Sequence, residues 1–329
     1  MIKFKIYFIL LIISITLNVF GQKKDDCNCD EAVLISKKLV SESSLKDSLS
    51  TQNLLKPLLY SKNLNCKITY YHFQVKLGFA NQNLEQVEGN LALAEKLISR
   101  QKCPKLYIQQ LKFFANLYNI KANYAKQLSY ELEILKLVED KESNLEITTS
   151  LLNVAQTLNR INKPKDAIIY AKRASINIKT IPESVEKVAI LNKASAAYLW
   201  YAQDFKDKIY LDSAKYFSAK ALQLSREYKL DKPQISALIR LNAIAQEENN
   251  LNQAIFYLSK AAALCNLNTD ISQLASIYSD KANIFKLKKD YNQAKKFADS
   301  SLYYNLRFKY APLIANSYHV IYEIEQARG

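Results

Sequence analysis

A recurrence of sequence features at intervals of forty residues is the strongest constraint on what this chain can fold into. The tripeptide Asn-Gln-Ala at 252–254 returns at 292–294, and each copy is followed three residues later by an aromatic residue. The same register marks one aromatic in each of five segments: Tyr130, Tyr170, Phe217, Tyr257 and Phe297. Such spacing predicts repeated supersecondary units, each of which buries its apolar face against the next.

Each of these aromatics stands between two positions that mostly hold small residues. Three residues before it are Gln127, Ala167, Ala214, Ala254 and Ala294, and four residues after it are Ile134, Ala174, Ala221, Ala261 and Ser301. These offsets place all three positions on one face of a helix, where small residues let a neighbouring helix approach closely. We therefore expect this segment to be the second helix of a hairpin.

A matching pattern precedes it and predicts the first helix. A large apolar position holds Leu111, Leu151, Leu191, Leu238, Tyr278 and Tyr318. Four residues later stand Ala115, Ala155, Ser195, Asn242 and Ala282, and three further on stand Tyr118, Leu158, Tyr198, Ala245 and Phe285. One interval is seven residues longer, and 201–208 is predicted to form the additional turn and loop.

The segment from Ile277 to Ser301 resembles a hairpin of the tetratricopeptide repeat (TPR) family. Units of that family carry a large, a small and an aromatic residue on the first helix, and Ala, an aromatic and Ala on the second. Two departures are visible: the standard step is 34 residues, and turns such as Ala122-Asn123-Tyr124 lack the usual glycine. The resemblance implies an all-α, right-handed superhelical stack of antiparallel helix hairpins.

The resemblance also sets the expected domain organisation. Residues 66–329 form the TPR-like solenoid, and residues 22–65 form an N-terminal segment with capping helices. Residues 315–328 match the first helix of a final hairpin, and this helix has no partner helix in the sequence. We therefore expect either a lone capping helix or a shortened version of a longer protein.

Composition agrees with long helices joined by short turns, since the chain has only four glycines and six prolines. The net charge of +15 is compatible with an acidic partner, a membrane surface or nucleic acid. A lysine-rich solvated surface explains the charge equally simply. No run of five like charges occurs, which argues against nucleic-acid binding.

Residues 1–21 follow the plan of a secretory signal peptide. Lys3 and Lys5 precede an apolar run from Ile6 to Phe20, and Gly21 precedes a polar segment. We expect an exported protein that is periplasmic or associated with the cell envelope, with no membrane span after signal cleavage. An uncleaved anchor is the alternative. Export also argues against nucleotide-dependent enzymes and DNA readers.

Four of the five cysteines lie in the first third of the chain, as expected for disulfides in an exported protein. A bridge between Cys27 and Cys29 would be strained. We therefore expect two bridges that join these two cysteines to Cys66 and Cys103, and the sequence leaves open which cysteine pairs with which. Only one closely spaced pair occurs, so no metal site is predicted. Cys265 is interpreted as a small buried helix residue.

No known catalytic or cofactor motif is present, so we predict neither an enzyme nor a cofactor. Four glycines cannot build a phosphate loop, and no Gly-x-Ser-x-Gly elbow occurs. His72 and His319 are each flanked by apolar helix residues and are interpreted as structural.

The remaining candidate site is the concave face of the solenoid, which first helices line. Polar residues beside the core positions are expected there: Lys112, Asn116, Asn119, Gln156, Asn159, Arg160, Arg240, Asn283 and Lys286. Their amides suit a peptide backbone and their cations suit a carboxylate, so an acidic or C-terminal peptide is the predicted ligand. An ordinary hydrated surface is the alternative.

The predicted function is therefore a non-enzymatic scaffold that binds a protein or peptide outside the cytoplasm. The alternative is a sensory TPR ectodomain of a truncated membrane signalling or transcription regulator protein. That alternative depends on the family resemblance alone.

Overall fold

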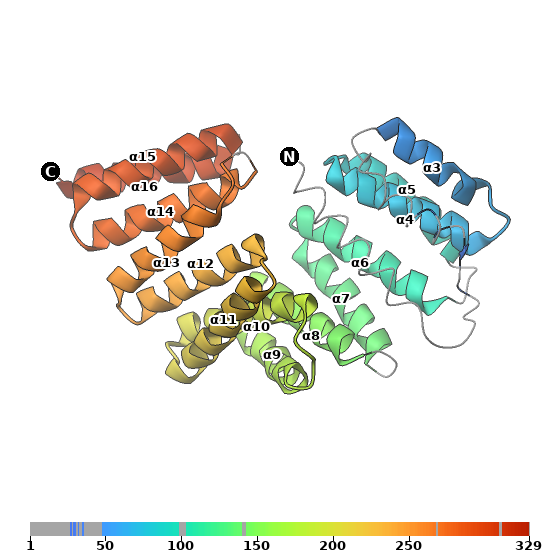
Figure 1. Cartoon of the computed structure of the whole chain (residues 1–329), viewed down its shortest axis with the longest axis horizontal. Coiled ribbons are helices and arrows are strands. Elements are labelled where there is room, and N and C mark those ends of the chain that lie inside the picture. Colours follow the sequence, from blue (N-terminus) through green and yellow to red (C-terminus); the bar gives the residue numbers. More distant parts are fainter. Residues whose placement is uncertain are drawn as a thin grey trace. The chain divides into compact units, whose positions relative to one another are not determined.

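The computed structural model describes residues 27, 29–30, 32, 35, 48–98, 103–139, 143–267, 269–308 and 311–328. Within them, 14 helices pack as consecutive hairpins of a TPR-like solenoid (Figure 1). The predicted all-α fold class is confirmed. The predicted signal peptide, 1–21, lies outside the described residues.

The helix bounds follow the predicted order of first and second helices. They are α3 (Ser48–Tyr60), α4 (Leu64–Ala80), α5 (Leu84–Ile98), α6 (Pro104–Ile120), α7 (Tyr124–Val138), α8 (Asn144–Arg160), α9 (Pro164–Ile178), α10 (Val185–Phe205), α11 (Lys208–Glu227), α12 (Asp231–Glu247), α13 (Leu251–Leu264), α14 (Ile271–Leu287), α15 (Tyr291–Phe308) and α16 (Ala311–Arg328). The predicted start of the solenoid at residue 66 lies two residues into α4.

The chain divides into two compact units, Met1–Lys141 (unit 1) and Glu142–Gly329 (unit 2). In unit 1, α4 pairs with α5 and α6 pairs with α7, and α3 packs on α4. In unit 2 the hairpins are α8–α9, α10–α11, α12–α13 and α14–α15, and α16 packs on α15 and α14. The even-numbered helices from α4 to α14 are the first helices of hairpins, and their partners are the second helices.

The small residues of the second helices are buried, as the repeat register predicted. Ala214, Ala254 and Ala294 are 0% exposed. The neighbouring aromatic ring packs against rings of its own first helix: Phe297 lies 5.3 Å from Phe285 and 6.1 Å from Tyr278, centroid to centroid. Small residues therefore allow close helix contact, and the aromatic fills the space beside it.

The turns within hairpins reach a left-handed backbone without glycine. Most have three residues, and the middle one has positive φ, as at Ala122 (φ 53°), Asn162 (φ 59°) and Lys289 (φ 59°). The following residue often caps the second helix: Asn123 Oδ1 accepts a hydrogen bond from the backbone N–H of Lys126 at 3.2 Å. This cap helps to hold a turn that the family usually builds with glycine.

The prediction of an additional loop at 201–208 is wrong. These residues lengthen two helices, because α10 continues to Phe205 and α11 begins at Lys208. The rings of Tyr201 and Phe205 lie 4.4 Å apart, and those of Tyr201 and Tyr210 lie 4.6 Å apart. The added helix ends pack on each other through aromatic rings, so a loop is not needed.

Two disulfides tie the N-terminal segment of unit 1 to its first helices. Cys27 is joined to Cys103, directly before α6, and Cys29 is joined to Cys66 in α4. The Cα atoms are 5.5 Å and 5.1 Å apart, within the usual range for disulfides. The structure thus selects one of the two arrangements that the sequence left open.

Among the described residues, no helix combines the length and the apolar character that crossing a bilayer requires. The apolar run at 6–20 was not part of that search, because it lies outside the described residues.

Candidate functional site

The first helices of unit 2 lie beside one another along the stack. α8 contacts α10 and α10 contacts α12, whereas successive second helices have no comparable contact within the described part of the chain. Side chains from consecutive first helices can therefore meet on one side of the unit. We call this side the first-helix face.

Polar contacts link three consecutive pairs of first helices on this face. They join α8 to α10, α10 to α12 and α12 to α14. The donors and acceptors are Lys193 Nζ to Asn153 Oδ1 at 2.5 Å, Arg240 Nη1 to Asn192 Oδ1 at 3.0 Å, and Asn242 Nδ2 to Asp280 Oδ2 at 3.3 Å. We call these six residues the first-helix ladder.

One position of the repeat accounts for four members of the ladder. Two residues after the large apolar position stand Asn153, Lys193, Arg240 and Asp280. At the same position α4, α6 and α16 carry Phe73, Phe113 and Val320, all buried. A position that is apolar elsewhere is thus polar or charged on four consecutive first helices of unit 2.

Arg240 is a half-buried cation whose hydrogen-bond partners are neutral. Nη1 donates to Asn192 Oδ1 and to the backbone carbonyl of Ser236 at 2.9 Å. Burial lowers the pKa of the guanidinium to about 10, because the charged form loses hydration. The guanidinium therefore remains charged at neutral pH without a carboxylate partner among the described residues.

Asp280 is a half-buried carboxylate held by a neutral amide. Burial raises its pKa to about 6, and the hydrogen bond from Asn242 acts in the opposite direction. The adjacent Lys281 does not neutralise it, since its Nζ lies over the rings of Tyr278 and Phe297, 5.9 Å and 5.2 Å from their centroids. In the described part of the chain no cation lies within ion-pair distance of Asp280.

Three of the residues proposed from the sequence lie in unit 1, on α6. Lys112 and Asn116 are exposed, and Asn119 is half-buried. These three residues belong to a helix whose ladder position is the buried Phe113.

The other six proposed residues lie in unit 2, and one of them, Arg240, belongs to the ladder. Lys286 is paired with Glu323 of α16, Nζ to Oε2, at 2.9 Å. Asn159 is only 5% exposed, and neither of its amide atoms has a hydrogen-bond partner among the described residues. Gln156, Arg160 and Asn283 are half-buried.

Sequence reasoning missed Asn153, Asn192, Lys193, Asn242 and Asp280. A signal was present for three of them, because their shared position changes from aromatic to polar at residue 153 and back to apolar at residue 320. Asn192 and Asn242 carry no comparable signal, since each is selected only by its partner on the next helix.

Formal charge in unit 2 is concentrated on the second helices. α9, α11, α13 and α15 contain eleven basic and four acidic residues, a net charge of +7. The first helices α8, α10, α12 and α14 contain seven basic and six acidic residues, a net charge of +1. The excess of positive charge expected on the first-helix face is therefore small, and individual charges matter more there than the total.

The histidines have structural surroundings. His72 is buried, and its Nε2 donates to Gln110 Oε1 at 2.8 Å. Burial lowers the pKa of His72 to about 4, so the ring is neutral near pH 7. His319 is exposed, with Nε2 at 4.0 Å from Glu323 Oε1. Among the described residues, no group of three or more His, Cys, Asp or Glu side chains could hold a metal ion.

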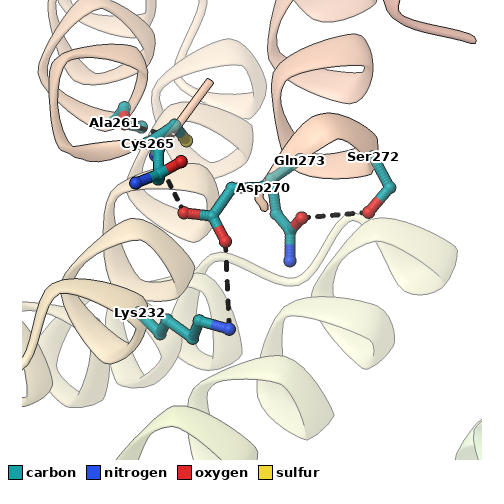
Figure 2. Close-up of polar contacts among 7 residues, drawn as sticks. Lys232, Ala261, Cys265, Asp270, Ser272 and Gln273 are labelled. Atoms are coloured by element: carbon teal, nitrogen blue, oxygen red, sulfur yellow. Dashed lines mark hydrogen bonds and ion pairs between the residues drawn. The ribbon is translucent and has the colours of Figure 1, made fainter. Parts of the chain in front are cut away.

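A second polar cluster in unit 2 fastens the segment between α13 and α14 (Figure 2). Asp270 accepts a hydrogen bond from the backbone N–H of Asn266 at 2.9 Å, and its Oδ1 lies 3.8 Å from Lys232 Nζ. Cys265 is half-buried, and its thiol donates to the carbonyl of Ala261 at 3.3 Å. Burial raises the pKa of the Cys265 thiol to about 11, so the thiol is protonated near pH 7.

No protein-family model matches the chain, and no curated protein matches it in sequence. Solved structures do resemble it. Aspartyl phosphate phosphatase F from Bacillus subtilis matches with a TM-score of 0.55 and 14% identity, covering 99% of this chain and 90% of that one. A Rap protein in complex with competence and sporulation factor matches with a TM-score of 0.54 and 12% identity, covering 96% and 90%.

A tetratricopeptide repeat protein from Parabacteroides merdae is similar to the same degree. Its TM-score is 0.54 at 11% identity, and the match covers 88% of this chain and 99% of that one. Identities this low show the fold alone. The chain is a TPR-like helical repeat protein, and the activity named for any one neighbour does not transfer to it.

Proposed function

We propose that this chain is a non-enzymatic scaffold that binds an extended segment of a partner protein on the first-helix face of unit 2. The observation that carries the proposal is the first-helix ladder, which replaces buried apolar residues with amides and charges on four consecutive first helices. Amide side chains can both donate to and accept from a peptide backbone. The TPR-like fold supports this, since proteins and peptides are its usual ligands.

The proposed location is outside the cytoplasm, in the periplasm or the cell envelope. Two features support it: the signal-peptide pattern at 1–21 and the two disulfides of unit 1. Disulfides form and persist in oxidising compartments. Cell fractionation combined with thiol alkylation tests this, and a cytoplasmic protein with four alkylated thiols in unit 1 would contradict it.

The scaffold proposal includes no catalysis, although one structural neighbour is named a phosphatase. On the first-helix face the ladder consists of amides and three charged side chains, and the described residues place no nucleophile beside a base there. A sensory ectodomain of a longer signalling protein is the second candidate. It rests on the family resemblance, and the coding sequence downstream of residue 329 distinguishes it from a separate scaffold.

Site-specific photocrosslinking tests the binding face. Benzoylphenylalanine is placed at Asn153, a half-buried ladder residue on α8, and as a matched control at Phe256, a half-exposed residue on the second helix α13. Irradiation of cells should give a discrete adduct from position 153 and none from position 256. Equal adducts from both positions, or none from position 153, would overturn the proposed binding face.

A further inference from the structure

Arg240 and Asp280 carry opposite charges at the same repeat position on α12 and α14. Each is held by an asparagine of the preceding first helix, Arg240 by Asn192 and Asp280 by Asn242. The carboxylate therefore accepts its hydrogen bond from a neutral amide and not from the cation in the same row. The two charges stand in line along the first-helix face without forming an ion pair within the described residues.

Joining the helices does not require these charges. Neutral amides also link first helices, as Asn192 Nδ2 on α10 does when it donates to the backbone carbonyl of Pro233 on α12 at 3.3 Å. Removing an ion from water is unfavourable unless an opposite charge or several hydrogen bonds compensate. Half-buried charges with neutral partners therefore indicate a role that involves a further charged group.

Both charged groups have polar atoms that are neither hydrogen-bonded nor fully buried within the described residues. Arg240 Nε and Nη2 and Asp280 Oδ1 make no hydrogen bond in the described part of the chain, and none is among the fully buried polar atoms that lack a partner. These atoms of the guanidinium and of the carboxylate therefore keep some exposure to solvent on neighbouring first helices.

We propose that the first-helix face recognises a dipolar peptide segment, in which an acidic side chain binds Arg240 and a basic side chain binds Asp280. This rests on the proposed scaffold function and adds the charge pattern of the ligand. Lys193 lies on α10, which precedes α12 in the row of first helices, whereas α14 follows it. Lys193 therefore adds positive charge near the acidic end of the ligand. The ligand therefore runs along the ladder in one direction.

The spacing of the helices sets the spacing of the two ligand charges. α12 and α14 approach closely enough for the Asn242–Asp280 hydrogen bond, and neighbouring helices in contact lie about 8–10 Å apart. Residues i and i+2 of an extended peptide point to the same side and are about 6.8 Å apart. Long side chains such as Glu and Lys span the difference, so an acidic and a basic residue separated by one residue fit the row.

Fluorescence anisotropy with defined peptides tests the proposal on the full oxidised chain. The probes are acetylated, amidated nine-residue peptides of Ala and Ser that carry Glu-x-Lys or Lys-x-Glu, and versions with Gln for Glu or Met for Lys. One charge order should bind about tenfold or more tightly than its Gln and Met versions, because hydrogen bonds to charged groups are strong. The opposite order should bind weakly.

Single variants separate the two contacts. Arg240→Gln should abolish the preference for Glu over Gln and retain the preference for Lys over Met, and Asp280→Asn should do the converse. Lys260→Gln on the exposed side of α13 is the matched control and should change neither preference. A chain with Arg240→Asp and Asp280→Arg together should prefer the opposite order, and circular dichroism verifies that each variant is folded.

Two results would overturn the dipolar proposal while leaving the scaffold proposal intact. They are equal binding of charged and neutral peptides, and failure of every peptide to bind, in either case with the photocrosslink at Asn153 retained. Absence of a crosslink at position 153 is the separate result that would overturn the proposed binding face itself.

Discussion

Asn242 on α12 donates a hydrogen bond from Nδ2 to Oδ2 of Asp280 on α14, at 3.3 Å. It is the only hydrogen bond that Asp280 accepts within the described residues, and burial raises the pKa of the carboxyl from 3.8 to about 6. Between these pH values the folded chain binds a proton at Asp280 more tightly than the unfolded chain does. This tighter proton binding stabilises the folded state, and the stabilisation is fully present below pH 3.8 and is lost as the pH rises through 6.

We therefore predict that Asp280→Asn stabilises the protein at pH 7.5, by an amount on the order of 2 kcal/mol. The gain should disappear below about pH 4, where Asp280 is protonated in both states. Urea unfolding at a series of pH values measures this. Asp299→Asn, on the exposed side of α15, removes the same charge and serves as the control. A loss of stability in Asp280→Asn at pH 7.5 would contradict the prediction.

Gly78 lies where α4 packs closely on α5. A Cβ at this position would lie 2.8 Å from Val87 Cγ2 and 3.2 Å from the carbonyl oxygen of Asn83. We expect Gly78→Ala to lower the free energy of unfolding by about 1–3 kcal/mol, because α5 must shift away. Gly89→Ala on the exposed side of α5 meets nothing within 4 Å and should stabilise by about 0.5–1 kcal/mol. If Gly78→Ala stabilised the protein as much as Gly89→Ala, the close approach at Gly78 would be disproved.

Ala122 has a φ of 53° in the turn between α6 and α7. A left-handed conformation costs a residue with a Cβ about 1–2 kcal/mol, and glycine avoids this cost. Part of the gain is offset because glycine is more flexible in the unfolded chain. Ala122→Gly should therefore raise the free energy of unfolding by about 0.5 kcal/mol. Ala92→Gly on the exposed side of α5 is the helical control and should lower it, and thermal unfolding compares the two.

The Cys29–Cys66 disulfide closes a loop with a sequence separation of 37 in unit 1. Replacing both cysteines with serine should destabilise unit 1 by about 3–4 kcal/mol, since the unfolded chain gains conformational entropy. Hydrogen exchange resolved by helix should show the loss in α3 and α4. Cys265→Ser in unit 2 removes a thiol that forms no disulfide and should leave the sensitivity to reductant unchanged. Equal exchange in α4 with and without the disulfide would contradict the prediction.

The sequence by itself determined the repeating hairpins of this protein. Small and aromatic residues recur at a fixed step, as Ala254 and Tyr257 do at Ala294 and Phe297. They recur because each hairpin packs against its neighbour with the same helix geometry. Local periodicity carries that information, so the all-α fold and the burial of the small residues were predictable. The same reasoning predicted Arg240 beside the core positions of a first helix, and in the structure it joins α12 to α10.

Only the tertiary structure decided which polar side chains meet. Arg240 and Asn192 are 48 residues apart in sequence, and Asn242 and Asp280 are 38 apart. Whether two such residues touch depends on the rotation and offset of one helix against the next, which the repeat step does not specify. The same reason applies to the pairing of Cys29 with Cys66 and to the lengthened ends of α10 and α11. The periodicity predicts which face of its helix a residue occupies, whereas only the packing of the helices determines which residue of the neighbouring helix lies opposite.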